Sequence, residues 1–425
     1  MRLGLALYRL GTVLLSPFLG VILNKRVRAS KEAPDRRNQR YAKQLPERPS
    51  GPLVWLHAAS VGESLIQLEL AATLLTSGHN TALLFTCQTL TGADTINQRL
   101  TTDPRFSNSW HLQQMAPLDT PAAAQRFVQH WQPSLALFAE GEIWPNLLMQ
   151  LSRHDIPAAL INARMTEKSI SGWRRWPKTS QAIFGSFAVI LASNQKTARA
   201  LEKLSKQPVP CPGNLKSALP LPQATKGDLA PLNTVIANRP VLVAASTHDG
   251  EEALILEALP HINPRPFTII APRHPERGDQ IETLLRASKL SYARRSRGDE
   301  PTTQTDILLA DTMGEMGLWY RLADTVYLGG GHTPGIGGHN PLEPLRLGKP
   351  VITGPGLFNF EEMADALIKE GGLKIVHTAQ DIATAFPATP PTPALLAKLE
   401  TEAAGPMKAT LAALEPYLPK QGSVS

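Results

Sequence analysis

Short apolar runs alternate with helical or turn-rich stretches along the chain, and this alternation restricts the fold more than any other feature. The runs cover residues 53–59, 81–85, 135–139, 158–161 and 188–192 in the first half, and 240–245, 268–271, 306–309, 325–328 and 350–353 in the second. Apolar runs of this length with helices between them are typical of buried parallel strands joined by crossover helices. The sequence therefore predicts an α/β fold.

The two halves of the chain begin with the same pattern of strand, loop and helix. Residues 53–59 lead through Ser60-Val-Gly-Glu63 into a helical pattern at 64–75, and residues 240–245 lead through 246–251 into a second helix. A chain of 425 residues is also longer than a single hydrophobic core usually supports. We therefore expect two Rossmann-like domains, at residues 51–222 and 223–425, with a proline-rich linker near their boundary and a final helix over residues 393–418.

Ligands of open parallel sheets bind outside the carboxyl ends of the strands. Motifs that follow the strands of each half are therefore expected at one edge of each sheet. If the two edges face each other, the ligand site is a cleft between the domains.

The N-terminal segment has the composition of a membrane anchor. Residues 3–23 are mostly apolar, Arg9 interrupts them, and a basic run follows. About 20 apolar residues span a bilayer, and flanking lysine and arginine mark the cytoplasmic side. We expect an anchor at residues 1–24 and a basic linker at 25–50, with Arg9 leaving open an interfacial helix instead of a span. A secretory signal is disfavoured because its basic residues precede the apolar core.

Charge and cysteine content narrow the class of partner and the compartment. The net charge of +7 and the pI near 9.4 favour an anionic partner, without choosing between nucleic acid, phospholipid and a phosphorylated substrate. Cys87 and Cys211 are the only cysteines, which argues against a disulfide framework or a structural zinc site and fits a reducing compartment. Trp173-Arg-Arg-Trp176 suits a lipid headgroup interface. No wider aromatic and basic module supports a nucleic-acid partner, so none is expected.

The stretch from Gly329 to Glu343 combines a glycine-rich loop with the start of a helix. It follows the strand-like residues 324–328, and its glycines allow the backbone to approach a ligand closely. Asn340 is expected to cap the helix, Pro341 to take the first helical position and Glu343 to lie in the first turn, where free amides favour an anion. The alternative is a capping box behind an ordinary turn.

Acidic and basic residues follow strands of the first half. Glu63 forms a capping-box pattern with Ser60, and a carboxylate there is also placed to accept a proton from an attacking hydroxyl. Glu140 and Glu142 follow residues 135–139 and suit ligand contact, although Glu142 could instead serve the next helix start. Arg164 and Lys216 bring cations to the same rim.

The second half carries two further motifs at strand ends. Arg273 and His274 follow one strand, and Gly314, Glu315 and Met316 follow another. Arginine holds phosphate by paired hydrogen bonds, and Gly314 allows close backbone approach. His274 is either a ligand contact or a helix cap.

Together these motifs resemble the 3-deoxy-D-manno-octulosonic acid (Kdo) transferases of lipopolysaccharide synthesis. The matching segments are Trp55-Leu-His-Ala-Ala-Ser-Val-Gly-Glu63, Glu142-Ile-Trp-Pro-Asn146, Ile161-Asn-Ala-Arg164, Gly213-Asn-Leu-Lys216, Arg273-His-Pro-Glu-Arg277, Asp311-Thr-Met-Gly-Glu315 and Gly337-Gly-His-Asn-Pro-Leu-Glu343. The resemblance implies a GT-B glycosyltransferase held by its N terminus at the cytoplasmic face of the inner membrane. It implies CMP-Kdo as donor and the lipid A precursor, lipid IVA, as acceptor.

The resemblance also implies roles for single residues. Glu63 is the expected general base, and Lys216 with Glu140 or Glu142 is expected to assist the transition state; the motif does not decide between the two carboxylates. The residues expected to hold CMP are Arg273, His274, Gly314, Glu315, Met316, Asn340, Pro341, Leu342 and Glu343. No metal or other cofactor is expected, because the leaving group is a monophosphate and the sequence lacks a clear Asp-x-Asp motif.

Two segments depart from the family pattern, and two other functions stay open. The residues after Lys216 and the entry to the glycine-rich loop at 329–334 are atypical, so the resemblance does not predict their local contacts. One alternative is another GT-B enzyme that transfers a sugar from a nucleotide to a lipid. The other is a membrane-bound nucleotide-binding protein without turnover.

Overall fold

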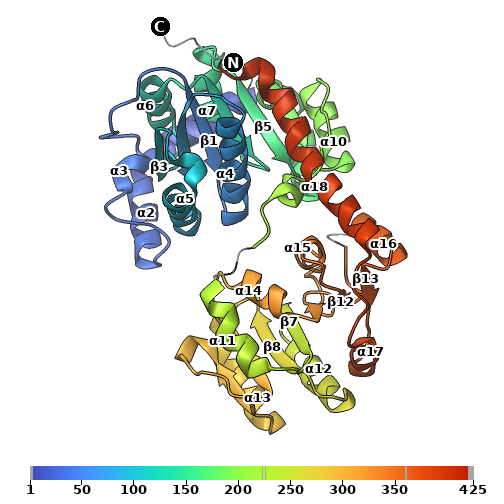
Figure 1. Cartoon of the computed structure of the whole chain (residues 1–425). Helices are drawn as coiled ribbons and strands as arrows, with labels where there is room; N and C mark the ends of the chain where they lie inside the picture. Colours follow the sequence, from blue (N-terminus) through green and yellow to red (C-terminus); the bar gives the residue numbers. More distant parts are fainter. Residues whose placement is uncertain (1–2, 223, 225, 359–360, 420–425) are drawn as a thin grey trace. The chain divides into compact units, whose positions relative to one another are not determined.

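The computed structural model describes residues 3–222, 224, 226–358 and 361–419 (Figure 1). By their internal contacts these residues divide into two compact units. Unit 1 comprises Met1–Leu219 and Glu402–Ser425, and unit 2 comprises Pro220–Thr401. The predicted division into two α/β domains is therefore observed, and each unit contains one parallel sheet.

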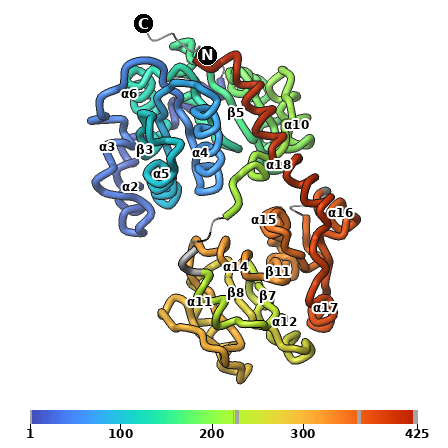
Figure 2. Tube along the Cα trace, viewed as in Figure 1, coloured from blue at the N-terminus to red at the C-terminus, as the bar shows by residue number. Residues whose placement is uncertain are grey.

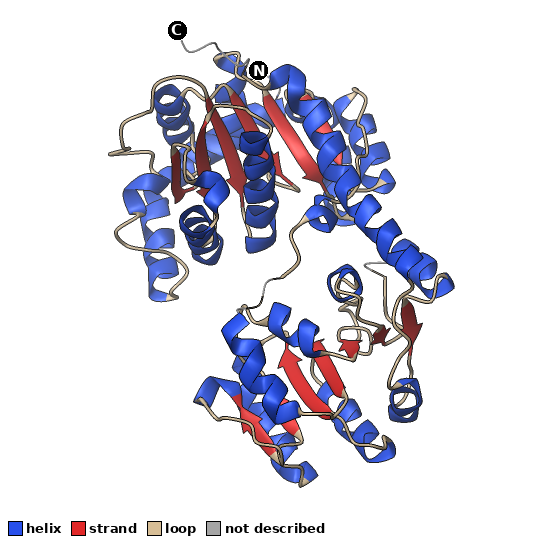
Figure 3. Ribbon diagram, in the orientation of Figure 1, coloured by secondary structure: helices blue, strands red, loops and turns tan. Residues whose placement is uncertain are grey.

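The sheet of unit 1 has six parallel strands in the order β3-β2-β1-β4-β5-β6. The strands are β1 (Leu53–Ala58), β2 (Ala82–Cys87), β3 (His111–Met115), β4 (Leu135–Ala139), β5 (Ala158–Ala163) and β6 (Val189–Ala192). The helices are α3 (Arg37–Arg40), α4 (Val61–Thr76), α5 (Leu90–Thr102), α6 (Pro121–Trp131), α7 (Pro145–Arg153), α8 (Glu167–Arg174), α9 (Pro177–Phe184) and α10 (Gln195–Ser205). Along β1, Leu53 and Trp55 pack toward α6, α7, α9 and α10, whereas Val54 and Leu56 pack toward α4 and α5. Both faces of the sheet are thus covered (Figure 3).

The sheet of unit 2 has seven strands in the order β13-β12-β11-β7-β8-β10-β9. The strands are β7 (Val241–Thr247), β8 (Phe267–Pro272), β9 (Tyr292–Arg294), β10 (Ile307–Leu309), β11 (Thr325–Leu328), β12 (Val351–Thr353) and β13 (Leu373–Ile375). The helices are α11 (Lys226–Ile236), α12 (Glu251–Ala258), α13 (Gly278–Ser288), α14 (Met316–Leu322), α15 (Leu342–Arg346), α16 (Glu361–Lys369) and α17 (Ala379–Ala385). Helices α12, α13 and α17 cover one face, and α11, α14, α15 and α16 cover the other.

Every apolar run that predicted a strand forms one, but three strands were not predicted. These are β3, β9 and β13, and each lies at the edge of its sheet. The sequence of β3 is His-Leu-Gln-Gln-Met, and β9 and β13 are only three residues long. An edge strand is covered less fully than a central one, so its sequence need not form an apolar run.

The C-terminal helix does not belong to one unit alone. Helix α18 (Pro393–Leu414) ends before a short turn at Glu415–Tyr417, close to the predicted end. Leu395 packs in the core of unit 2, whereas Met407 and Leu414 pack in the core of unit 1, to which the chain returns (Figure 2). The structure thus groups residues 402–419 with the first unit, whereas the predicted domain limits assign them to the second. The apolar pattern of a helix does not reveal which core receives it.

The N-terminal apolar segment forms two helices instead of one. Helix α1 (Leu3–Leu15) is followed by a 3-10 turn at Ser16–Phe18 and by α2 (Leu19–Arg28). Residues 3–28 are long and apolar enough to cross a membrane. Of the residues in their most apolar stretch, 6% are buried in the structure. The predicted boundary at residue 24 falls inside α2, whose last turn contains the first residues of the basic run, Lys25, Arg26 and Arg28.

Candidate active site

Glu63 lies in the first turn of α4, directly after the carboxyl end of the central strand β1. Ser60 is the N-cap residue, and its hydroxyl accepts a hydrogen bond from the Glu63 amide. The Glu63 carboxylate in turn accepts a hydrogen bond from the amide of Ala59 at 2.6 Å. The carboxylate also accepts a hydrogen bond from the Ser60 hydroxyl at 3.2 Å. The predicted capping box therefore forms only in part, because the backbone amide that the carboxylate reaches is that of Ala59 and not that of Ser60.

The Glu63 side chain is buried but adjoins other charged groups. The residue is 8% exposed, and this burial raises the pKa of its carboxyl to about 7, against the opposing hydrogen bond from Ala59. The negative charges of Glu142 and Glu140 raise the pKa further. A carboxyl group with this pKa exchanges protons readily near neutral pH, as a general base must.

Glu140 forms an ion pair with Lys216 at the end of β4. Lys216 Nζ lies 2.6 Å from Glu140 Oε1, and the amide of Asn162 also donates to this oxygen at 3.3 Å. The side-chain carbonyl oxygen of Asn162 accepts a hydrogen bond at 2.9 Å from the backbone amide of Leu215, the residue before Lys216. Asn162 therefore connects the loops that hold the pair. The sequence signal for Asn162 is its place two residues before Arg164, whose charge made Arg164 the more evident candidate.

The backbone at Glu140 and at Asn162 is in an uncommon conformation. Glu140 has φ of 54° and Asn162 has φ of 49°, so both residues are left-handed at the ends of neighbouring strands. Such conformations cost about 1–3 kcal/mol and persist where the surroundings enforce them, often at functional sites.

Glu142 is part of a different hydrogen-bond network. Its carboxylate lies 3.3 Å from His57 Nε2 and accepts a hydrogen bond from the Trp144 indole at 2.9 Å. Burial raises the pKa of Glu142, but the interactions with His57 and Trp144 outweigh it and hold the pKa below its ordinary value. His57 is fully buried and contacts Thr86 through its other nitrogen at 2.8 Å. Glu142 does not cap α7, so the interpretation as a helix-start residue is wrong.

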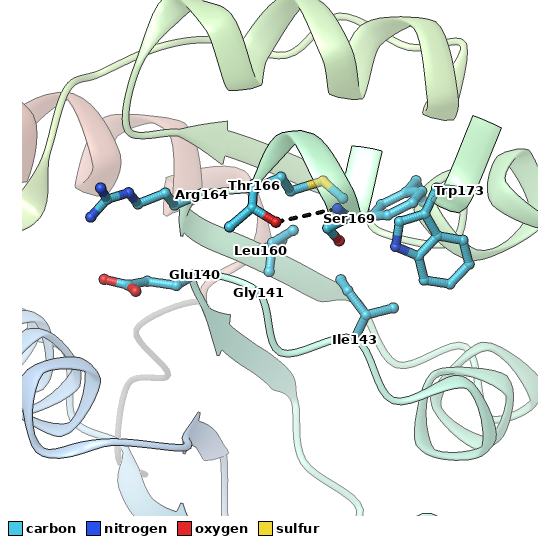
Figure 4. Close-up of a pocket in the computed structure, with 10 residues that line it drawn as sticks. Glu140, Gly141, Ile143, Leu160, Arg164, Thr166, Ser169 and Trp173 are labelled. Atoms are coloured by element: carbon cyan, nitrogen blue, oxygen red, sulfur yellow. Dashed lines mark hydrogen bonds between the residues drawn. The ribbon is translucent and has the colours of Figure 1, made fainter. Parts of the chain in front are cut away.

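A pocket with a volume of about 390 Å³ adjoins Glu140. Figure 4 shows Glu140 and Arg164 at one end of it and Trp173 at the other. The wall also includes Gly141, Ile143, Leu160, Met165, Thr166, Ser169 and Phe184. The pocket is therefore charged at one end and apolar at the other. Trp173 packs edge-on against Phe184, so only Trp176 of the predicted aromatic pair is exposed.

In unit 2 the glycine-rich loop follows β11, beside the central strand β7. A Cβ on Gly329 would lie 2.7 Å from a carboxylate oxygen of Glu251, so only glycine fits there. The buried Glu251 carboxylate accepts hydrogen bonds from the backbone amides of His248 at 2.9 Å, Gly330 at 2.9 Å and His332 at 3.0 Å. Glu251 therefore holds the loop to the end of β7. In sequence, the loop that contains Glu251 is the counterpart of Ser60–Glu63, a pattern that predicts no role for Glu251 itself.

The predicted donor-binding residues lie at the ends of β8 and β10. Arg273 and His274 are exposed directly after β8, and the His274 ring lies 3.4 Å from Glu276. His274 is the N-cap residue of a 3-10 turn at Pro275–Arg277, but its side chain makes no capping hydrogen bond. Gly314 has φ of 85° and open space around it. Glu315 precedes α14 and pairs with Arg295 at 2.7 Å. Met316 is the first residue of α14.

The segment from Asn340 to Glu343 leads into α15 with an arrangement other than the predicted one. The helix has five residues and begins at Leu342, so Pro341 is the N-cap residue instead of the first helical one. The Asn340 side chain accepts a hydrogen bond from the Leu342 amide at 3.1 Å, and no capping box forms with Glu343. Burial raises the pKa of Glu343, and Arg346 and Arg273 oppose the rise. Among the described residues, no hydrogen-bond donor contacts the Glu343 carboxylate.

No group of three histidine, cysteine, aspartate or glutamate side chains suited to a metal ion occurs within the part of the chain that the structure describes.

Comparisons with known proteins agree with the motifs. The profile described as "3-Deoxy-D-manno-octulosonic-acid transferase (kdotransferase)" matches residues 33–219. The 3-deoxy-D-manno-octulosonic acid transferase of Bordetella pertussis is 35% identical over 86% of this chain and 87% of its own length. The enzyme of the same name from Haemophilus influenzae is 32% identical over 81% of this chain and 82% of its own.

A solved glycosyltransferase from Rickettsia africae has the same fold. Its TM-score is 0.52 at 12% identity, and the match covers 87% of this chain and 95% of that one. The two parallel sheets are accordingly those of a GT-B-like fold, as predicted.

Proposed function

Because the chain belongs to the 3-deoxy-D-manno-octulosonic acid (Kdo) transferase family, we propose that it transfers Kdo from CMP-Kdo to lipid IVA with inversion at the anomeric carbon. The observation that carries the proposed mechanism is Glu63, a buried carboxyl at the end of β1 with a pKa of about 7. The names of the relatives support Kdo as the transferred sugar. The residues of the two units support the proposed donor, acceptor and mechanism.

Glu63 acts as the general base in this mechanism. Its carboxylate takes the proton of a primary hydroxyl on the acceptor while the hydroxyl oxygen forms a bond to the anomeric carbon of Kdo. The bond from that carbon to the phosphate oxygen of CMP breaks, and CMP leaves with the electron pair. A single displacement of this kind inverts the configuration.

Of the two candidate carboxylates, Glu140 is the one that assists the transition state together with Lys216. Its ion pair brings an ammonium group, one-third exposed, to the end of β4. Gly62 lies beside that ammonium, because a Cβ there would be 3.7 Å from Lys216 Nζ, and Glu63 follows Gly62 in the chain. Glu142, in contrast, is engaged with His57 and Trp144, which suits a positioning role.

The residues after the strands of unit 2 hold the CMP part of the donor. Arg273 supplies an exposed guanidinium group that fits a phosphate, and the backbone at Gly314, next to Glu315 and Met316, is open to close approach. The Glu343 carboxylate is suited to accept hydrogen bonds from ribose hydroxyls. The helix start at Leu342 is short, so the side chains, more than a helix dipole, provide this recognition.

The pocket beside Glu140 suits an acceptor that is polar at one end and apolar at the other. Arg164 lies at its charged end, where it can meet an acceptor phosphate. Trp173 also lines a second, mostly apolar pocket with a volume of about 220 Å³, whose other walls include Leu5, Leu7 and Tyr8 of α1. This pairing of a charged pocket with an apolar neighbour supports a glycolipid acceptor.

We propose further that α1 lies in the surface of the inner membrane, at its cytoplasmic face, instead of spanning the bilayer. Tyr8 donates a hydrogen bond to Asp119 at 2.9 Å, and Asn146 donates one to Thr12 at 3.1 Å. These contacts dock one side of α1 on unit 1. The other side exposes large apolar side chains, including Leu10, 55% exposed, and Leu14, 64% exposed. This division between a docked side and an apolar side is that of an interfacial helix.

The double variant Leu10→Glu/Leu14→Glu tests the membrane contact. Burying two leucine side chains contributes on the order of 3–6 kcal/mol, so we expect binding to weaken at least tenfold. The measurement is sedimentation of the full chain with phosphatidylglycerol-containing vesicles. Ile368→Glu, a single apolar-to-glutamate substitution at an exposed residue of unit 2, is the control. Equal sedimentation of the double variant and the control would exclude α1 as the main membrane contact.

Nucleotide specificity tests the proposed donor. We expect CMP to raise the Tm of the purified chain, and UDP and GDP at the same concentration to have little effect, because only ligands that bind the folded state stabilise it. Stabilisation by UDP or GDP instead of CMP would favour another GT-B enzyme that uses a nucleotide sugar.

A further inference from the structure

His248 and His339 bring two separate loops of unit 2 into direct contact. His248 follows β7, and His339 lies in the glycine-rich segment after β11. Their Nε2 atoms are 2.8 Å apart, and the rings are nearly parallel, with an interplanar angle of 9°. Two ring nitrogens at this distance share a proton, so one imidazole donates and the other accepts. The contact ties together two of the strand ends that surround the proposed CMP site.

Titratable groups of both signs surround the pair. The groups that act on it are Arg273, His274, Arg277 and Glu251. Glu252 and Asp249 neutralise Arg277, and Glu251 is occupied by three backbone amides. The His274 ring lies 5.9 Å from the His248 ring, and Arg273 is exposed. Among the described residues Arg273 forms no ion pair, so its guanidinium group is available to a negatively charged ligand.

The same surroundings keep the free pair uncharged. Burial, together with His248, Arg273 and His274, lowers the pKa of His339 to about 4, and burial also lowers the pKa of His248. In the neutral pair, the imidazole that donates through Nε2 has a bare Nδ1, and this atom can take an additional proton. A bound anion would offset the positive charges that now oppose that protonation.

We propose that His248 and His339 form a phosphate-binding pair, and that this pair takes up a proton from solvent when the nucleotide's phosphate binds beside Arg273 and His274. The inference rests on the proposed function and adds two residues to its donor site. The extra proton turns a neutral hydrogen-bonded pair into a cation next to the phosphate. In the transfer reaction, that charge is in place when the departing CMP gains negative charge.

Proton uptake on CMP binding tests this inference. Calorimetric titration of the full chain at pH 7, in two buffers with different ionisation enthalpies, measures the protons exchanged with CMP and with cytidine. We expect uptake of between about half a proton and one proton with CMP and none with cytidine, which lacks the phosphate. His339→Gln and His248→Gln should reduce the uptake and weaken CMP binding about tenfold or more, because a charge-assisted hydrogen bond is lost.

The exposed residue His261 provides the control, since His261→Gln is the same substitution in unit 2 outside the pair. This variant should keep the uptake and the affinity of the parent chain. If CMP binds the parent without proton uptake, or if the uptake survives both pair substitutions, the inference fails while the proposed donor stands. If CMP does not bind, the proposed donor and the inference fail together.

Discussion

Replacing Glu63 by glutamine should lower kcat/KM for Kdo transfer by about 10²–10⁴, the usual contribution of a general base. Glutamine has nearly the same shape, and its carbonyl oxygen can still accept the hydrogen bond that Ala59 donates. The amide cannot take a proton from the acceptor hydroxyl, so the fold should survive while the chemical step is lost. The measurement is initial rate with CMP-Kdo and lipid IVA, alongside thermal unfolding of the variant.

The pH dependence of the parent enzyme gives an independent view of Glu63. Its carboxyl, with a pKa of about 7, is protonated below that pH and then cannot act as a base. The kcat/KM should therefore fall as pH drops through 7, by about tenfold at pH 6 relative to the plateau at high pH. The residual activity of Glu63→Gln should lack this decline.

A second glutamate-to-glutamine substitution on α4 distinguishes loss of the base from a general effect on the helix. Glu69 lies on the same helix and pairs with Arg105 at 2.9 Å, away from the β1 end, so Glu69→Gln should keep near-parent activity. Near-normal turnover by a folded Glu63→Gln enzyme would contradict the assignment of Glu63 as the base.

Replacing Lys216 by methionine should lower kcat by about 10²–10³, the effect of removing one group that stabilises developing negative charge. Methionine keeps much of the apolar stem, while Glu140 loses the ammonium that lies 2.6 Å away. The measurement is steady-state transfer, with Lys203→Met, at an exposed position of α10, as the control.

Combining Lys216→Met with Glu140→Gln distinguishes two roles of the ion pair. If both residues act on the transition state as one unit, the double variant should be about as slow as the slower single variant. Recovery of activity in the double variant would mean that Lys216 serves only to neutralise Glu140. Independent, additive losses would contradict joint action.

The fold was predictable because its signals are local. The runs at 53–59 and 240–245 are central strands buried on both faces, and such strands need apolar residues throughout. The edge strand β3 is partly exposed and contains two glutamines, so it did not show this signal. Residues 402–419 return to unit 1 through tertiary packing, which the helical pattern of α18 does not predict.

The residues of the candidate site likewise differ in whether a local motif or a long-range contact reveals them. Glu63, Arg273 and Glu343 stand out because each follows a strand within a recognisable motif. Asn162, Glu251 and the pair of His248 and His339 act through contacts between distant loops; Glu251 and Gly330, for example, are 79 residues apart in sequence. Such contacts cannot be read from the spacing within one motif. The likeness of the loop at 246–251 to Ser60–Glu63 was the nearest signal to Glu251, and it indicated a repeated fold element, not a role in holding the glycine-rich loop.

The most direct test of the proposed function is mass spectrometry of the lipid product formed from purified enzyme, defined lipid IVA and CMP-Kdo regenerated in the reaction. We predict that lipid IVA gains the mass of one or more Kdo residues, and that Glu63→Gln forms far less of this product in the same time. Unmodified lipid IVA after prolonged incubation with folded, CMP-binding enzyme would contradict the proposed function.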